Sequence, residues 1–175
     1  MTDWIKAANP VAPITTTAEA RAAARASALA IFLGVAWGAV GAYILATGGS
    51  AEIEAAMAEA AGDAPEMAGM GAVAMQIALW SAVGLCVIQL ILGLIQWAKP
   101  NIVIPILFTI LVAFGLLSGL AGIMMAGQNG MPATAAAPTW QVWTGFAVLV
   151  IQLILHIAGI RGANALGRFL VAEAQ

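Results

Sequence analysis

WSAVGLCVIQLIL (residues 80–92) and WTGFAVLVIQLIL (residues 143–155) are two stretches of one chain that end in the same hexamer, VIQLIL. In both, the hexamer begins seven residues after a tryptophan, and neither stretch contains a charged residue. Continuous apolar runs favour helices over barrel strands, in which apolar and polar residues alternate. A helix also satisfies its own backbone hydrogen bonds in lipid. The two stretches therefore predict two related membrane-spanning helices.

The composition of the whole chain supports this assignment. Of its 175 residues, 63% are hydrophobic and 8% are charged, whereas soluble domains have about 45–50% apolar and about 25% charged residues. The net charge of -2 gives no support for a nucleic-acid partner. Cys86 is the single cysteine, so the chain has neither an internal disulfide nor a thiolate metal site. The sequence predicts an integral membrane protein.

Four stretches are long enough to cross a hydrocarbon core of about 30 Å, which takes about 20 helical residues. None of the four contains Asp, Glu, Lys or Arg. They cover residues 27–46, 76–97, 102–126 and 140–160. The predicted fold is all-α, with four transmembrane helices.

The basic residues predict the orientation. All six lie on one side of the four-helix arrangement, at Lys6, Arg21, Arg25, Lys99, Arg161 and Arg168. The positive-inside rule places that side, and with it both termini, in the cytoplasm. Acidic residues gather instead between the first two spans, on the opposite side. The pattern is typical of a multi-pass protein of a bacterial cytoplasmic membrane.

The spans divide the chain into four segments. Residues 1–26 form a cytoplasmic arm and the start of the first helix. Residues 27–126 contain the first three spans and an acidic outer loop at 47–75. Residues 127–160 contain a second outer loop and the fourth span. Residues 161–175 form a cytoplasmic tail. Thr16 and Glu19 have the spacing of a capping box, so the first helix is expected to start near Thr17.

The shared hexamer predicts that a helical hairpin is used twice. Aligning the two tryptophans places Gln89 opposite Gln152 and Gly93 opposite His156. A weaker similarity, VAWG at 35–38 and VAFG at 112–115, relates the first and third spans. Both hairpins run in the same direction, and parallel repeats of this kind occur in transporters. A plain four-helix bundle with a chance hexamer is the alternative.

Small residues mark the expected packing faces. In the first span they recur every fourth position, and the third span has a second set. Small residues let two helix backbones approach closely in lipid. The predicted packing residues are Ala30, Gly34, Gly38, Ala42, Gly115 and Gly119. They are expected either to pack helices within this chain or to meet another subunit.

Polar side chains inside the spans are the candidates for function. The predicted intramembrane site consists of Gln89, Gln152 and His156, with the two glutamines hydrogen-bonded to each other. Gln152 and His156 are four residues apart and share one helix face. The first interpretation of His156 is a hydrogen bond between helices. A quinone or lipid contact is a second, and a haem ligand a third, which would need a second histidine from another chain.

These observations favour a non-catalytic role. The spans lack the carboxylates that proton or cation coupling uses, and no Walker or Rossmann glycine pattern occurs. We expect a structural, accessory or assembly subunit of a larger inner-membrane complex, or a self-associating scaffold, with the lipid bilayer and other membrane subunits or itself as partners. No haem or quinone cofactor is expected, whereas bound lipid is. The alternatives are an oligomeric channel or transporter for a neutral or hydrophobic solute, and a redox subunit that uses His156.

Overall fold

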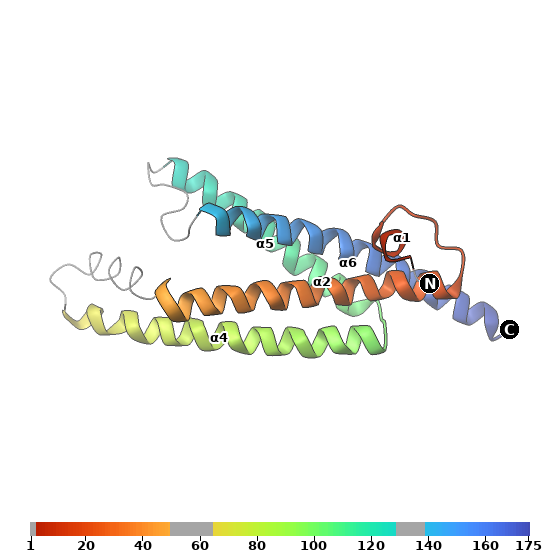
Figure 1. Cartoon of the computed structure of the whole chain (residues 1–175), viewed down its shortest axis with the longest axis horizontal. Helices are drawn as coiled ribbons and strands as arrows, with labels where there is room; N and C mark the ends of the chain where they lie inside the picture. The colour runs from red at the N-terminus through yellow and green to blue at the C-terminus, as the bar shows by residue number, and fades with distance from the viewer. Residues whose placement is uncertain (1–2, 50–64, 129–138) are drawn as a thin grey trace. The chain divides into compact units, whose positions relative to one another are not determined.

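A computed structural model of the chain describes residues 3–49, 65–128 and 139–175 (Figure 1). Every regular element in these three ranges is a helix, as predicted. The elements are α1 (Trp4–Ala8), α2 (Thr17–Ile44), the π-helical turn η1 (Leu45–Gly49), α4 (Pro65–Ala98), α5 (Val103–Gln128) and α6 (Thr139–Glu173). Four of these helices, α2, α4, α5 and α6, are long and apolar enough to cross a membrane.

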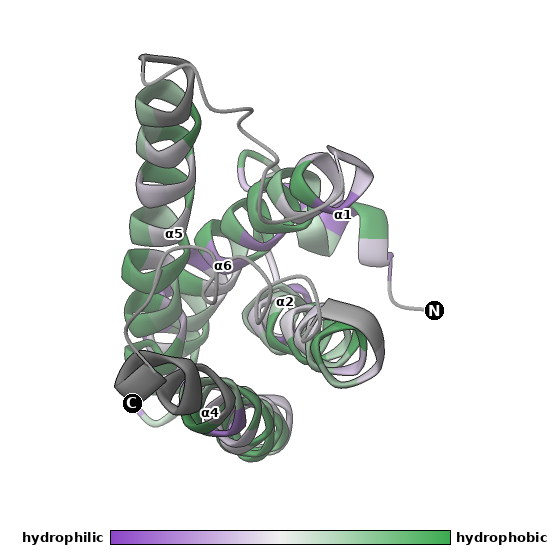
Figure 2. Cartoon of the chain, turned by 90° about the vertical axis from the view of Figure 1, so that its left-hand side faces the viewer, coloured by the Kyte–Doolittle hydropathy of each residue, from purple (hydrophilic) through white to green (hydrophobic). Residues whose placement is uncertain are grey.

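The described chain forms two compact units. One unit combines Met1–Gly34 with Gln89–Gln175, and the other is Val35–Ile88. In the first unit, α5 packs along α6, and α1 contacts α6. Hydrophobic residues predominate along α5 (Figure 2), and its large side chains Ile110, Phe114 and Leu117 are exposed. Such a surface suits contact with lipid, because lipid tails are as apolar as these side chains.

Local hydrogen bonds define the starts of α2 and α5. The hydroxyl of Thr16 accepts from the backbone N–H of Glu19 at 3.2 Å, and α2 begins at Thr17 as the capping pattern predicts. The side-chain oxygen of Asn101 accepts from the backbone N–H of Ile104 at 3.0 Å. Pro105 follows in the first turn of α5, where a missing N–H removes no helical hydrogen bond. The Asn101 cap marks the end of the turn between α4 and α5.

Helices extend into the predicted outer loop at 47–75 and into the predicted tail at 161–175. The outer loop expected at 47–75 ends earlier, because α4 begins at Pro65; proline is favoured at a first helical position, and the alanines and methionines that follow are strong helix formers. The remainder of this loop, residues 50–64, lies outside the described residues, as do residues 129–138 of the second outer loop. The tail expected at 161–175 is also helical, because α6 continues to Glu173.

Packing explains why α6 extends past its apolar span. Ala165 and Leu166 are buried against Ala20 of α2, and Ile14 and Phe169 pack on this cluster. A helix that keeps an apolar stripe in contact with a neighbour gains stability from that burial. Counting apolar residues in the sequence locates the apolar part of α6, whereas the three α6 residues of this cluster, Ala165, Leu166 and Phe169, keep the helix packed beyond it.

Candidate intramembrane polar site

His156 lies in the interior of the first unit, at the middle of α6. Its side chain is 0% exposed. The ring nitrogen Nδ1 is 2.8 Å from the hydroxyl oxygen of Ser27 on α2, and the ring stacks on Phe108 of α5 with 5.5 Å between centroids. Among the described residues, Nε2 has no hydrogen-bond partner. His156 thus connects three helices through one hydrogen bond and one ring contact.

Gln152 lies one turn before His156 on α6 and also contacts α2. Its side-chain nitrogen Nε2 donates to the backbone oxygen of Ala30 at 3.0 Å. A Cβ atom placed on Gly34 would overlap this nitrogen and would lie 3.4 Å from Oε1 of Gln89. The predicted hydrogen bond between Gln89 and Gln152 is therefore replaced by one from Gln152 to the α2 backbone. Gly34 provides the space in which both amides approach α2.

Gln96, at the end of α4, is a member of this site that the sequence prediction omitted. Its side chain is 0% exposed. Nε2 donates to the backbone oxygens of Ala24 at 3.2 Å and Asn101 at 3.1 Å, and Oε1 accepts from the N–H of Asn101 at 3.2 Å. One buried amide therefore joins α2, α4 and the turn that leads into α5. Its position seven residues after Gln89, two helical turns away on the same face, is the signal that could have identified it.

Ser27 is the second omitted member. A Cβ atom on Gly159, one turn after His156, would lie 2.5 Å from the Cβ of Ser27, so only glycine allows this approach of α6 to α2. Ala24, Ser27 and Ala30 succeed one another at intervals of three and share one face of α2. We call these three residues, together with Gln96, Gln152 and His156, the polar seam. Gln96, Gln152 and His156 each make one polar contact to this face of α2.

Five of the six predicted packing residues, all but Ala42, lie against partners within the chain. Ala30 is 0% exposed. A Cβ atom on Gly38 would lie 2.9 Å from Sγ of Cys86, one on Gly115 3.8 Å from Leu149, and one on Gly119 2.9 Å from Phe146. Ala42 is half-buried. These close approaches occur inside the two units and use the small residues as hairpin contacts.

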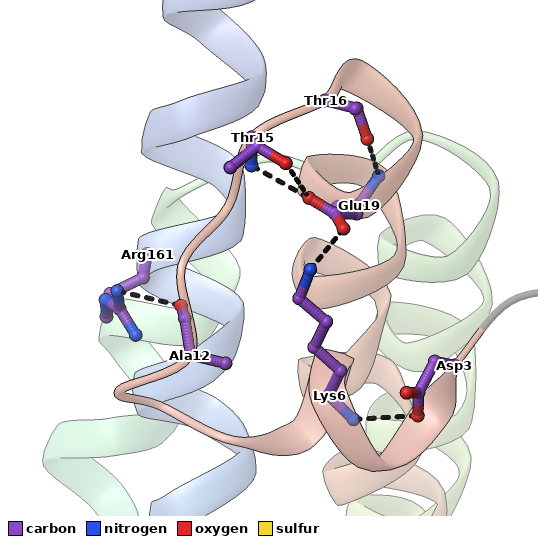
Figure 3. Close-up of polar contacts among 7 residues, drawn as sticks. All are labelled: Asp3, Lys6, Ala12, Thr15, Thr16, Glu19 and Arg161. Atoms are coloured by element: carbon purple, nitrogen blue, oxygen red, sulfur yellow. Dashed lines mark hydrogen bonds and ion pairs between the residues drawn. The ribbon is translucent and has the colours of Figure 1, made fainter.

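A cluster of charged and polar residues attaches the N-terminal arm to the start of α2 (Figure 3). Lys6 forms an ion pair with Glu19. Glu19 also accepts hydrogen bonds from the N–H and the hydroxyl of Thr15, both at 2.8 Å. Arg161 of α6 donates to the backbone oxygen of Ala12 at 3.3 Å. The arm is thus fastened to α2 through Glu19 and to α6 through Arg161.

These contacts change the titration of Glu19, which lies eight residues before the apolar stretch that starts at residue 27. The hydrogen bond from Lys6 is the largest cause, followed by those from Thr15, and together they lower the pKa of Glu19 from 4.5 to about 2. Each partner donates to the carboxylate and so favours its charged form. The charged form of Glu19 is the one that holds the arm.

Two tryptophans and an arginine lie at the same end of the first unit. The rings of Trp4 and Trp97 stack with 5.9 Å between centroids and 14° between planes. The guanidinium carbon of Arg25 is 5.3 Å from the Trp97 ring centroid, and Nε of Arg25 donates to the backbone oxygen of Trp97 at 3.0 Å. Indole rings are enriched at the membrane–water interface. This cluster marks a boundary of the apolar region.

The chemistry available to the seam is limited to a hydroxyl, an imidazole, amides and backbone carbonyls. Within the described residues, no group of three or more His, Cys, Asp or Glu side chains has the arrangement of a metal site. The carboxylates of Asp3 and Glu19 lie on or beside the arm and not in the seam. The seam contacts join helices to one another.

Comparison with family models, with curated proteins and with solved structures finds no match to this chain.

Proposed function

We propose that this chain is a non-catalytic integral membrane protein that serves as a structural, accessory or assembly subunit of a larger membrane complex, or as a self-associating scaffold. One observation carries the proposal. The polar side chains of the seam are 0–6% exposed, and their hydrogen bonds go to α2 and to the turn between α4 and α5. A solute or substrate needs polar groups that it can reach, whereas groups that join helices need to be enclosed.

We further propose that both termini face the cytoplasm of a bacterial inner membrane. Contacts in the first unit support a common end for most of the basic residues. Arg161 reaches Ala12 of the arm, Lys6 of the arm reaches Glu19, and Arg25 reaches Trp97, two residues before Lys99. Basic residues collected at one end of a helical bundle define its cytoplasmic side.

Duplication of a parallel hairpin is the third part of the proposal. In the sequence alignment Gly38 corresponds to Gly115, and Cys86 to Leu149. A Cβ atom on Gly38 would lie 2.9 Å from Cys86, and one on Gly115 would lie 3.8 Å from Leu149. The first hairpin thus joins α2 to α4 at the same aligned positions that join α5 to α6 in the second.

A second pair of contacts supports the same alignment. Ile31 and Phe108 correspond, because each lies four residues before an aligned valine, and Gly93 corresponds to His156. A Cβ atom on Gly93 would lie 2.7 Å from Cε1 of Phe32 and 3.1 Å from Cγ2 of Ile31, and Phe108 stacks on His156. Two contacts in matching register favour common descent over a chance hexamer.

Recovery of the protein from its native membranes tests the functional proposal. The tagged chain is solubilised in a mild detergent and purified. Mass spectrometry identifies the associated proteins, and light scattering gives the molar mass of the purified complex. We expect other membrane subunits in a fixed ratio, or a defined homo-oligomer. A monomer would contradict the proposal. A homo-oligomer that conducts a neutral solute after reconstitution would favour the channel alternative, and a haem absorption band would favour the redox alternative.

A further inference from the structure

A groove of about 370 Å³ lies between the N-terminal arm and the first turns of α2. It is lined by Trp4, Thr17, Ala18, Arg21, Ala22 and Arg25. Two of these six residues are arginines and none is acidic. The hydroxyl of Thr17, at the edge of the groove, donates to the carboxylate of Glu173 at 2.7 Å. The groove therefore carries an excess of positive charge.

The two arginines are four residues apart and lie on one face of α2. Arg25 is held by its Nε hydrogen bond to the Trp97 carbonyl and by its contact with the Trp97 ring. Its two terminal nitrogens have no hydrogen-bond partner among the described residues, and the exposed guanidinium of Arg21 has none there either. Free guanidinium donors beside a groove are suited to a phosphate, which they bind through paired N–H groups.

A neighbouring cavity of about 380 Å³ differs in this respect. Its lining holds Lys6 and Arg161 but also Asp3 and Glu19. Lys6 is paired with Glu19, and Arg161 donates to a backbone oxygen. The cations of that cavity are compensated or engaged. An anion is therefore attracted to the groove at Arg21 and Arg25 in preference to this cavity.

The depth of the groove identifies the anion. Arg25 lies two residues before the apolar stretch at residue 27, about 3 Å along the helix, and Arg21 lies about 6 Å further out. Trp4 lines the groove and stacks on Trp97, and indoles gather at the level of lipid headgroups. A phosphate at this depth belongs to a lipid.

We propose that this groove binds the phosphodiester headgroup of an anionic phospholipid, with Arg21 and Arg25 as its donors. Basic pockets between helices on the cytoplasmic side of membrane proteins bind such headgroups. The assignment requires only that this end of the first unit meets a membrane surface. It does not depend on the accessory role proposed above.

Native mass spectrometry of the delipidated protein in detergent tests the site. The protein is mixed with equal amounts of phosphatidylglycerol and phosphatidylcholine that have the same acyl chains. We expect the wild type to retain phosphatidylglycerol in preference. Arg21→Gln should weaken that retention about fivefold, the factor expected for one basic residue near an anionic surface, and Arg21→Lys should restore most of it. Arg21 is exposed, so its substitution leaves helix packing unchanged.

Lys99→Gln is the matched control. Lys99 is an exposed basic residue of the same unit that does not line the groove, and its loss should leave phosphatidylglycerol binding unchanged. Equal weakening by both variants would overturn the site in favour of diffuse charge attraction. Equal retention of the two lipids by the wild type would also overturn it. Displacement of the lipid by inorganic phosphate at millimolar concentration would overturn the lipid assignment and indicate a site for free phosphate.

Discussion

The imidazole Nδ1 of His156 lies 2.8 Å from the hydroxyl oxygen of Ser27, across 129 residues of sequence. The same face of α2 accepts from Gln96 at Ala24 and from Gln152 at Ala30. In lipid there is little hydrophobic driving force between helices, so close packing and hydrogen bonds determine which helices associate and in which register. The polar seam therefore fixes the position of α2 against α4 and α6.

Gly162 should be intolerant of any side chain. A Cβ atom there would overlap the backbone nitrogen of Ala24 and would lie 2.5 Å from the carbonyl carbon of Ala23. Because the obstructing atoms are backbone, Gly162→Ala must move α6 away from α2, at a cost of about 1–3 kcal/mol. The measurement is the free energy of unfolding in mixed micelles. Gly167→Ala is the control: nothing lies within 4 Å of its Cβ position, so it should be neutral or stabilising by up to about 1 kcal/mol. Equal effects of the two variants would refute the close approach.

Replacing Gln96 with leucine should loosen the turn between α4 and α5. The substitution removes the three hydrogen bonds that a fully buried amide makes to Ala24 and Asn101, at a cost of about 1–3 kcal/mol. Thermal unfolding followed by circular dichroism measures it. Gln76→Leu is the control on the same helix, because Gln76 is exposed and its loss should change stability by less than about 0.5 kcal/mol. If Gln96→Leu is as stable as the control variant, the Gln96 amide does not stabilise the packing of α2, α4 and the turn.

Attachment of the N-terminal arm should weaken in acid. The pKa of Glu19 is lowered to about 2 in the folded protein from 4.5, so its contribution is complete above pH 4.5 and is lost as the pH falls from 4.5 towards 2. Proteolysis of the arm should therefore speed up over this range in the wild type. In Glu19→Gln, cleavage should already be fast at pH 7 and should vary less with pH, and Lys6→Met should behave similarly. The measurement is the rate at which an acid-stable protease cleaves the arm, divided at each pH by its rate on an unfolded peptide. Identical pH profiles of wild type and Glu19→Gln would contradict the assignment.

Reporter fusions should show both termini in the cytoplasm. Alkaline phosphatase, which is active only outside the cytoplasm, should be inactive after Gln175 and active when inserted at residues 129–138. Green fluorescent protein should give the opposite pattern. Both expectations follow from the basic residues, which determine the side of the protein that stays in the cytoplasm. Phosphatase activity at the C-terminus would reverse the proposed topology.

The helices could be predicted from the sequence because their signals are local. Runs of about 20 apolar residues locate the four long helices, and Thr16 and Glu19 locate the start of α2 at Thr17. The extension of α6 to Glu173 could not be located in this way, since it depends on the contact of Ala165 and Leu166 with Ala20.

The candidate site could be predicted only in part for the same reason. Gln152 and His156 stand out as polar residues in an apolar run. Their partners are a backbone carbonyl of Ala30 and a small hydroxyl at Ser27, and neither has a distinctive pattern in the sequence. The identity of a partner that lies more than a hundred residues away is a property of helix packing, so only the structure supplies it.

A double-mutant cycle on Ser27 and His156 tests the central claim that the intramembrane polar groups hold helices together. Ser27→Ala, His156→Leu and the double variant are unfolded in mixed micelles, with Ser81→Ala as the control because Ser81 is exposed. We predict a coupling free energy of about 0.6 kcal/mol and at most about 1.7 kcal/mol, the average and the maximum for interhelical hydrogen bonds in a membrane protein. If the coupling free energy is zero and His156→Leu is as stable as the wild type, the structural role is contradicted. A role of His156 in binding a ligand or cofactor would then be favoured.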